Sequence, residues 1–433
     1  MVPKGFQSIT GLGSCPSDWL VKSADELTSK ITKGTTPPKT EIVSDSKIPF
    51  LRVNNLGFNG ELDTSSDMIF VTQEAHNNSL ARSIAYPGDI LMNIVGPPLG
   101  KIAMLSQDFD EYNMNQAIVI YRTISSKVNK DYFLNFLSSE LAQQWLQSRS
   151  KKTSGQQNLT IQLCKELPVP TPPLPEQQKI AKILSTWDKA ISTTERLIDN
   201  STQQKKAVMQ QLLTGKKRLL DESGKRFEGE WNWVKIKEIC AKVIDNRGKT
   251  PPLSTNGLPL VEINSIVGNK YPQLSKITKF VSEDTFNTWF RNGHPTKGDI
   301  LVATVGSAGI NALVDLEEGF GCIAQNLIAL RTKPCVDDTF LYYLMNTPDY
   351  FSKVQAVVMG AVQPSIKVPH LLDFSLLIPV LAEQQKIATV LTNADKEIEL
   401  LEQQLADLQQ EKKALMQVLL TGKVRVLVDG EVA

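Results

Sequence analysis

A block of 41 residues occurs twice in this chain, without a gap, 207 positions apart. The first copy spans 176–216 and the second spans 383–423, and 22 of the 41 positions are identical. Both copies begin with EQQKIA and end with LLTGK. Shared helical composition would not give so close a match. The chain therefore consists of two halves, each a variable region followed by a near-constant segment, and such an architecture presents two similar surfaces at a fixed separation.

Each copy shows the alternating four- and three-residue spacing that defines a coiled-coil seam. The apolar seam residues of the first copy are Ile180, Leu184, Trp187, Ile191, Ile198, Val208 and Leu212, and those of the second are Ile387, Leu391, Ile398, Leu401, Leu405, Leu408, Leu415 and Leu419. A lysine interrupts both seams at the equivalent place, Lys205 and Lys412, and one polar seam residue commonly sets register. We therefore expect two long helices that pack against each other, most simply antiparallel.

The limits of these helices are marked by proline before them and glycine after them. Gly215 and Gly422 stand where a C-terminal cap requires glycine. The segment PVPTPPLP at 168–175 could be a polyproline ligand, but the second copy keeps only Pro379 at the corresponding place. We interpret it as a stiff extended segment that leads into the helix.

The variable regions upstream of the helices are a second, more divergent repeat. The pattern GDIL occurs at 88–91 and 298–301, and IPFLRVNN at 48–55 matches LPLVEINS at 258–265. These patches are rich in Val and Ile and are bounded by Gly, Pro and Asn, which is typical of short strands. Helical stretches follow at 132–150 and 339–358. The pattern predicts α+β domains at 1–172 and 217–378, with a helical segment at 173–216 and a second helix with its tail at 379–433.

The bulk properties limit the class of protein. A chain of 433 residues suits several domains, and its hydrophobic fraction of 41% is that of a folded globular protein. Its five cysteines are an odd number without a CxxC spacing, which favours reduced thiols and neither disulfides nor a zinc site. No apolar run reaches the ~18 residues of a membrane span. We expect a cytoplasmic protein.

Motifs for catalysis are incomplete. The string Gly248-Lys249-Thr250 ends like a phosphate-binding loop, but the glycine required five positions earlier is Val243, and two prolines follow. The three histidines have no spaced metal partners, and no N/D-P-P-Y/F segment of an amino-methyltransferase is present. The sequence predicts a non-catalytic binding protein without a cofactor or metal of its own.

Charge leaves nucleic-acid binding undecided, because the net charge is only +1. The segment 171–220 has nine basic against four acidic residues, so any polyanion surface would be local. Lys and Arg bind phosphates, whereas Gln and Asn pair with adenine edges. On these grounds the DNA-contact candidates of the first half are Lys33, Asn54, Asn55, Lys101, Lys151, Lys152, Gln156, Gln157 and Asn158, and those of the second are Arg247, Lys249, Asn264, Lys270, Gln363 and Lys367. The alternative for each is an ordinary solvated loop.

These features together resemble the specificity subunit of type I restriction-modification systems. The resemblance rests on PLPEQQKIAKIL at 173–184 and PVLAEQQKIATVL at 379–391, each ahead of a long helix ending in LLTGK, and on the paired GDIL patches. It implies two target-recognition domains of α+β fold, joined by two long antiparallel coiled-coil helices in a pseudo-twofold internal repeat.

The resemblance also implies function and partners. Each half would read one half of a bipartite, asymmetric double-stranded DNA target, and the helices would set the spacing and dock two methyltransferase subunits. Restriction subunits are a further partner in such systems. S-adenosylmethionine and ATP with Mg would belong to the partner subunits. The alternative is a scaffold whose helices hold two protein-binding domains apart, with no DNA involved.

Overall fold

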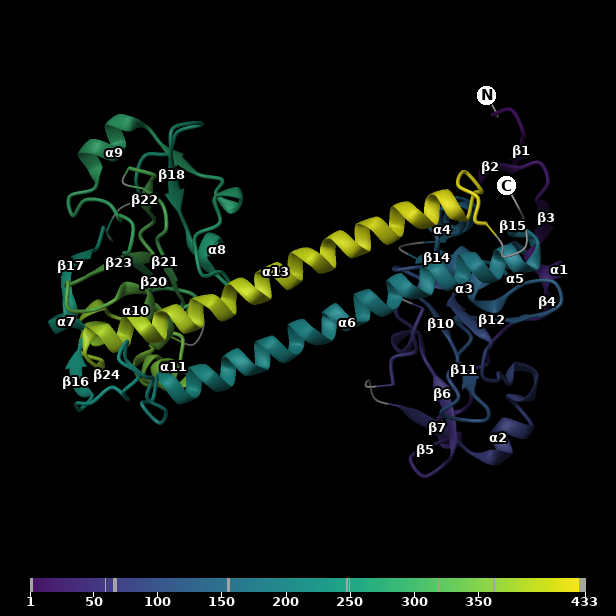
Figure 1. The fold of residues 1–433 in the computed structure, drawn as a ribbon, viewed down its shortest axis with the longest axis horizontal. Coiled ribbons are helices and arrows are strands. Elements are labelled where there is room, and N and C mark those ends of the chain that lie inside the picture. Colours follow the sequence, from purple (N-terminus) through teal and green to yellow (C-terminus); the bar gives the residue numbers. More distant parts are fainter. Residues whose placement is uncertain are drawn as a thin grey trace. The chain divides into compact units, whose positions relative to one another are not determined.

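The computed structural model describes residues 3–58, 60–64, 68–153, 156–246, 248, 250–317, 319–360 and 363–427. It divides into two compact units (Figure 1). Unit 1 consists of Met1–Glu195 with Gln403–Ala433, and unit 2 of Arg196–Glu402. Each unit therefore contains one predicted variable region together with one part of each long helix.

The central sheet of unit 1 is antiparallel, with the strand order β10 (Ile102–Met104), β8 (Ile90–Asn93), β12 (Ile118–Thr123), β4 (Thr28–Lys33). Ile90 and Met92 of β8 join one apolar cluster, whereas Leu91 joins another. Alternate residues of a strand point to opposite faces. Both faces of the sheet are therefore covered, which explains why its strands read as continuous apolar runs.

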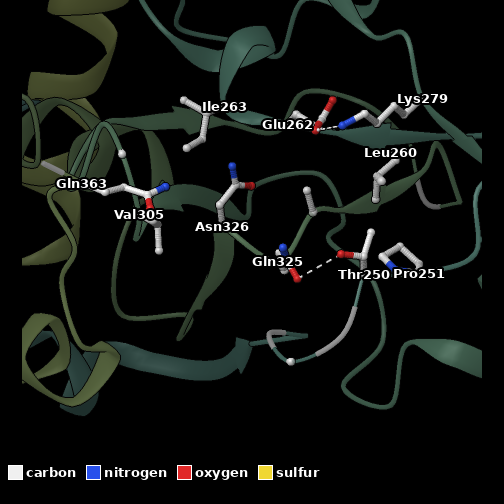
Figure 2. Close-up of a pocket in the computed structure, with 13 residues that line it drawn as sticks. Thr250, Pro251, Leu260, Glu262, Ile263, Lys279, Val305, Gln325, Asn326 and Gln363 are labelled. Carbon is white, nitrogen blue, oxygen red and sulfur yellow. Dashed lines mark hydrogen bonds and ion pairs between the residues drawn. The ribbon is translucent and has the colours of Figure 1, made fainter.

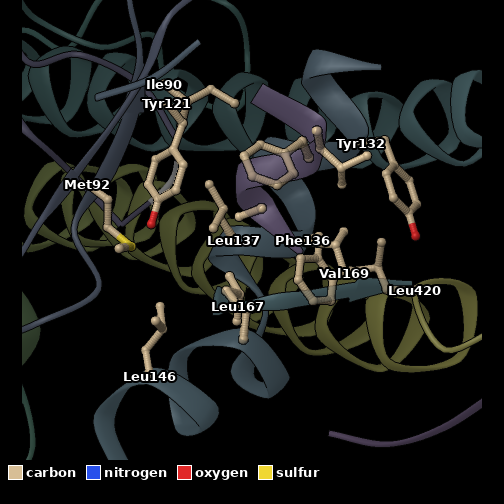
Figure 3. Close-up of a cluster of buried hydrophobic side chains, with 14 of the residues drawn as sticks. Ile90, Met92, Tyr121, Tyr132, Phe136, Leu137, Leu146, Leu167, Val169 and Leu420 are labelled. Carbon is tan, nitrogen blue, oxygen red and sulfur yellow. The ribbon is translucent and has the colours of Figure 1, made fainter. Parts of the chain in front are cut away.

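Figure 3 shows part of the cluster on one face of this sheet, where Met92 and Tyr121 lie near helical residues such as Phe136 and Leu146. A second sheet of unit 1 has the order β11 (Asn113–Met114), β6 (Ile48–Leu51), β7 (Ile69–Val71), β5 (Ile42–Val43). Its β11–β6 pair is parallel.

Unit 2 repeats this plan. Its central sheet has the order β21 (Asn311–Leu313), β20 (Ile300–Ala303), β23 (Leu327–Thr332), β17 (Cys240–Ile244), and its second sheet has the order β22 (Cys322–Ile323), β18 (Leu258–Val261), β19 (Phe280–Val281). The β18–β22 pair is again parallel. The predicted α+β class and the internal repeat are therefore confirmed.

The GDIL patches have a structural explanation. Asp89 accepts a two-pronged hydrogen bond from the guanidinium of Arg122, and Asp299 accepts one from Arg331 at the same place in unit 2. Both aspartates are buried, and such charge-assisted bidentate pairs fix geometry as well as charge. The shared aspartate therefore ties two central strands together in each unit.

Each predicted helical stretch is wrong in one respect, because it is two helices. In unit 1 they are α3 (Lys130–Ser138) and α4 (Glu140–Ser148), with Ser139 extended and its side chain accepting from the N–H of Ala142. In unit 2 they are α10 (Asp338–Leu344) and α11 (Pro348–Val357), where Thr347 caps and Pro348 begins the helix. Serine and threonine caps start helices at these breaks, and proline fits the first turn.

Two-stranded ribbons lead into the long helices. Strand β15 (Pro168–Thr171) pairs with β3 (Leu20–Ser23), and β24 (Ser375–Ile378) pairs with β16 (Asn232–Lys235). The proline-rich lead-in thus includes a strand. The remaining elements are short. Four are helices: α2 (Gln73–Asn77), α5 (Ile161–Glu166), α9 (Glu283–Trp289) and α12 (Val368–Leu372). The elements that the site below uses are β9 (Val95–Gly96), β13 (Lys151–Thr153), β14 (Gln156–Asn158) and α8 (Ile263–Ile266). A hairpin of β1 (Phe6–Ile9) and β2 (Gly13–Pro16) precedes the ribbon of unit 1.

The long helices are α6 (Leu174–Leu212) and α13 (Leu381–Leu419). Their predicted seam residues are buried or half-buried, whereas apolar residues off the seam, such as Leu197 and Leu400, are exposed. Within unit 1 the late residue Lys412 of α13 pairs with the early residue Asp188 of α6. Within unit 2 Lys205 of α6 pairs with Asp395 of α13. The helices are therefore antiparallel in both units, and each seam lysine meets an aspartate of the other helix.

The repeated ends of the block meet one another in the same way. The guanidinium of Arg425, just beyond α13, donates to both oxygens of the buried Glu176 at 2.7 and 2.9 Å, and Arg218 does the same to Glu383 at 2.6 and 2.7 Å. Gly215 and Gly422 have φ of 70° and 67°, as the predicted caps require. The start of one helix is thus held to the end of the other.

None of the described helices combines the length and the apolar character that crossing a bilayer requires.

Candidate nucleic-acid interface

A hairpin carries the predicted loop of unit 1. Strands β13 and β14 pair antiparallel, and β14 continues the sheet to β9 through Gln157 opposite Gly96 and Asn158 opposite Val95. In unit 2 the same three segments are joined by single bridges, Val305 to Ser365 and Met359 to Ser365. Gln156 and Gln363 therefore occupy corresponding places on corresponding hairpins, and both are exposed.

Beside the hairpin of unit 2 lies a hollow of about 570 Å³ (Figure 2). Its polar lining residues come from separate segments: Thr250 from the loop after β17, Glu262 and Lys279 from the flanks of β18 and β19, Gln325 and Asn326 from the turn between β22 and β23, and Gln363 from the hairpin. Because the strands end here, their following turns bring these side chains together.

The polar groups of the hollow differ in how far the fold satisfies them. The ammonium of Lys279 lies 2.8 Å from Glu262 Oε1, and the Thr250 hydroxyl donates to Gln325 Oε1 at 3.4 Å. Asn326 Oδ1 is shielded from solvent and has no hydrogen-bond partner among the described residues. In Figure 2 Asn326 lies between Val305 and the Gln325–Thr250 pair. The hollow is thus lined by amide groups that can both donate and accept hydrogen bonds.

The other candidates of unit 1 have varied surroundings. Lys33 is exposed at the end of β4, and Asn54 is exposed in a single helical turn, whereas the neighbouring Asn55 is 1% exposed. Asn55 Oδ1 accepts from the N–H of Arg52 and its amide donates to the carbonyl of Asp63. The fold therefore uses Asn55 internally, which does not favour its predicted DNA contact.

The remaining candidates of unit 1 are Lys101 and the residues of the hairpin. The ammonium of Lys101 lies 6.0 Å from the ring centre of the exposed Phe58. Lys151 is exposed on β13, Lys152 stands opposite Gln157 in the same hairpin, and Gln157 and Asn158 are half-buried.

In unit 2 the predicted residues that the structure describes do not form one cluster. Arg247 and Lys249 lie outside the described residues. Asn264 is exposed on α8 and donates to the carbonyl of Lys276. Lys367 is exposed and precedes α12. Of the four candidates of this half that lie within the described residues, Gln363 is the one that lines the hollow of Figure 2.

Lys270 lies in a network of polar contacts inside unit 2. Its side chain is 15% exposed, and its ammonium lies 2.8 Å from the Tyr343 hydroxyl and 3.2 Å from Asp395 of α13. Burial lowers the pKa of Lys270, and the carboxylate of Asp395 opposes that shift. A lysine committed to the helix in this way is poorly placed to bind a phosphate, so the structure does not favour the predicted DNA contact.

The sequence-based selection missed Gln325 and Asn326. The signal was present, because the apolar segments QAIVIYR at 116–122 and QNLIALR at 325–331 both begin with glutamine. In the structure this glutamine precedes the strand, and Gln325 lines the same hollow as Gln363.

These features have counterparts in known proteins. The family model of the type I restriction modification DNA specificity domain matches the chain twice, at residues 16–200 and 228–410. The chain therefore belongs to the family of type I restriction-modification DNA specificity subunits, and the predicted family is confirmed.

A putative type I restriction enzyme specificity subunit (MjaX) of Methanocaldococcus jannaschii is 27% identical over 449 residues, with 96% of each chain covered. A solved chain from a study of complex assembly and conformational transition of the type I R-M system covers 95% of this chain and 99% of that one, with a TM-score of 0.57 and 16% identity. The type I S subunit from M. genitalium covers 93% and 96%, with a TM-score of 0.54 and 16% identity. These two structures establish the fold.

Proposed function

We propose that this chain gives a type I restriction-modification complex its DNA specificity by reading a bipartite, asymmetric target. The domain of unit 1 reads one half-site and the domain of unit 2 reads the other. The helices α6 and α13 set the unspecified gap and dock two methyltransferase subunits. Membership of the specificity family supports the proposal, and the repeated architecture supports its division into two half-sites.

The observation that carries the proposal is the set of helix contacts that recurs in the two units. In each unit an arginine pairs with the glutamate that begins the repeated block, and a seam lysine pairs with an aspartate of the other helix. These pairs are Glu176–Arg425 and Asp188–Lys412 in unit 1, and Glu383–Arg218 and Asp395–Lys205 in unit 2. Two equal ends of this kind suit two copies of one partner, because equal surfaces bind equal subunits.

The chemistry is proposed to lie in the partner subunits. Methylation with S-adenosylmethionine, and cleavage with ATP and Mg, would be carried out by methyltransferase and restriction subunits, with this chain as the non-catalytic reader in the cytoplasm. The relative from M. jannaschii is described as a specificity subunit, which supports this division of labour.

Methylome sequencing tests the proposal. A cell that expresses this chain with its cognate methyltransferase subunit is compared with a cell that expresses the methyltransferase subunit alone. We expect a new split motif that appears only with this chain. Absence of any motif, although the complex forms, would contradict DNA reading and favour a protein-binding scaffold.

The spacing role has its own test. Seven residues, one heptad, are inserted after Asn200 in α6 and after Leu400 in α13, so that both seams keep their register. At ~1.5 Å per residue the insertion adds about 10 Å, or about three base pairs. We expect the gap of the methylated motif to lengthen while both half-sites stay the same. An unchanged gap would rule out the spacing role.

A further inference from the structure

The turn before β12 in unit 1 and the turn before β23 in unit 2 are held by the same framework of backbone hydrogen bonds, and so are the hairpins beside them. The N–H of Ile94 donates to the carbonyl of Ala117 at 2.7 Å, and the N–H of Thr304 donates to that of Asn326 at 2.9 Å. The N–H of Asn115 donates to Leu51, as that of Ala324 donates to Val261. Residues 115–117 of unit 1 therefore correspond to 324–326 of unit 2.

The hairpin is joined to the same framework residue. Leu159 donates through its N–H to the carbonyl of Ile94 at 2.9 Å, and Ile366 donates to Thr304 at 2.8 Å. Three positions earlier on each hairpin stand Gln156 and Gln363. Ile94 in unit 1 and Thr304 in unit 2 thus hold both the turn and the hairpin in place. Support of this kind makes a recognition surface rigid.

Two of the three polar positions on this framework are shared and one is not. Gln116 matches Gln325, and Gln156 matches Gln363, and all four are exposed. The third position is Ala117 in unit 1 and Asn326 in unit 2. At these three positions the two units therefore share two glutamines and differ in one residue.

The chemistry of these side chains fits base edges. A glutamine carboxamide can donate to adenine N7 and accept from its amino group in the major groove. Asn326 is half-buried at the hollow, and its Oδ1 is shielded and has no partner among the described residues. A turn of this carboxamide toward a base donor would make a hydrogen bond that the fold leaves unmade. Alanine has no hydrogen-bonding group, and its methyl suits a thymine methyl.

We propose that Gln325, Asn326 and Gln363 read bases of the second half-site, and that Gln116, Ala117 and Gln156 read bases of the first. The residue at the third position, Asn326 in unit 2 and Ala117 in unit 1, makes the two half-sites differ. The inference rests on the proposed function. In this arrangement the glutamines contact a feature that the half-sites share, and Asn326 contacts a base that carries an exocyclic amino group.

The test is methylome sequencing of single variants with the cognate methyltransferase subunit. Asn326→Ala is expected to lose preference at one base pair of the second half-site, by roughly tenfold or more, and to leave the first half-site unchanged. Asn232→Ala is the control, because Asn232 is exposed on the ribbon strand β16 of the same unit, outside the hollow.

A second variant guards against a folding defect at Asn326. Ala117→Asn is expected to change one base pair of the first half-site only. If wild type gives a split motif but both variants give that same motif unchanged, the inference is overturned while the proposed function stands. If wild type gives no motif, the proposed function itself fails.

Discussion

The two units attach their sheet domain to the helices differently at the equivalent point. In unit 1, Asp188 pairs with Lys412 at the edge of a hollow of about 570 Å³, and 39% of its side chain is exposed. In unit 2, Asp395 pairs with Lys205 and also with Lys270 and Tyr343 of the sheet domain, and is 24% exposed. The helix pair is repeated, but the domain's contribution to it is not.

Two substitutions explain the difference. The carbonyl of Lys270 accepts from the N–H of Leu313, and at the same place in unit 1 the carbonyl of Gly60 accepts from Met104. Lys270 therefore corresponds to Gly60, which has no side chain. The capping residues Asn129 and Asp337 show that residues of α3 and α10 correspond at 208 positions apart, so Tyr343 corresponds to Asn135. The amide of Asn135 donates to the carbonyl of Asp131 within its own helix. A common scaffold thus accepts domains that contact it to different extents.

The largest expected effect is that of Asp395→Ala. Removing this carboxylate leaves Lys205 and the mostly buried Lys270 without their counter-charge, so we expect unit 2 to lose about 3 kcal/mol of local stability. Asp188→Ala, the matched change in unit 1, should cost about 1 kcal/mol, because that pair is more exposed. Hydrogen exchange of peptides within 381–402 and 403–419 measures each unit separately. Equal effects would contradict the comparison.

Lys270→Ala should have the next largest effect and separates a structural lysine from a DNA contact. We expect a loss of about 2 kcal/mol in unit 2, because Asp395 and Tyr343 lose a charged partner. The salt dependence of DNA binding by the complex should stay unchanged, since no phosphate contact is removed. A reduced salt slope without a stability change would restore the sequence-based prediction for Lys270.

Tyr343→Phe should cost about 1 kcal/mol, because it removes one hydroxyl that bonds Asp395 and Lys270. The loss of stability is measured by thermal unfolding monitored by hydrogen exchange. Greater stability of the Tyr343→Phe variant would contradict this prediction and would show that the buried hydroxyl destabilises the folded state.

Acid should reduce the difference between the units. Burial raises the pKa of Asp395, but hydrogen bonds from Lys205 and Tyr343 and the charges of Lys205 and Lys270 outweigh it, so the net pKa is lowered. A lowered carboxyl pKa stabilises the fold above the unfolded value near 4, and this contribution is lost as pH falls through the folded pKa. The stability difference between wild type and Asp395→Ala should therefore narrow below about pH 4. A constant difference would contradict the pairing.

The helices were predictable from sequence because their evidence is local. The seam spacing, the capping glycines and the ungapped repeat all lie along one segment, and the structure confirms them. The breaks at Ser139 and Thr347 were missed although a capping serine and an N-terminal proline mark them. There the helical periodicity on either side hid the boundary.

The candidate site was less predictable because it depends on tertiary placement. Gln363 was selected for its residue type and lies at the hollow, but Asn55 and Lys270 were selected on the same ground and lie in internal networks. Asn326 was missed because an unpaired side-chain oxygen cannot be recognised until its neighbours are known. Residue type indicates what a side chain can bind, and the fold decides whether it is available.

The division of the chain has a consequence for its synthesis. Unit 2 is one continuous stretch, 196–402, whereas unit 1 joins 1–195 to 403–433. At about 5–20 residues per second, the ribosome needs roughly 10 to 40 s to pass from the first part of unit 1 to the second. During this interval Glu176 has no Arg425, and Ile180 and Leu184 have no α13 beside them. A premature stop codon within 403–425 would therefore damage the domain that was translated first.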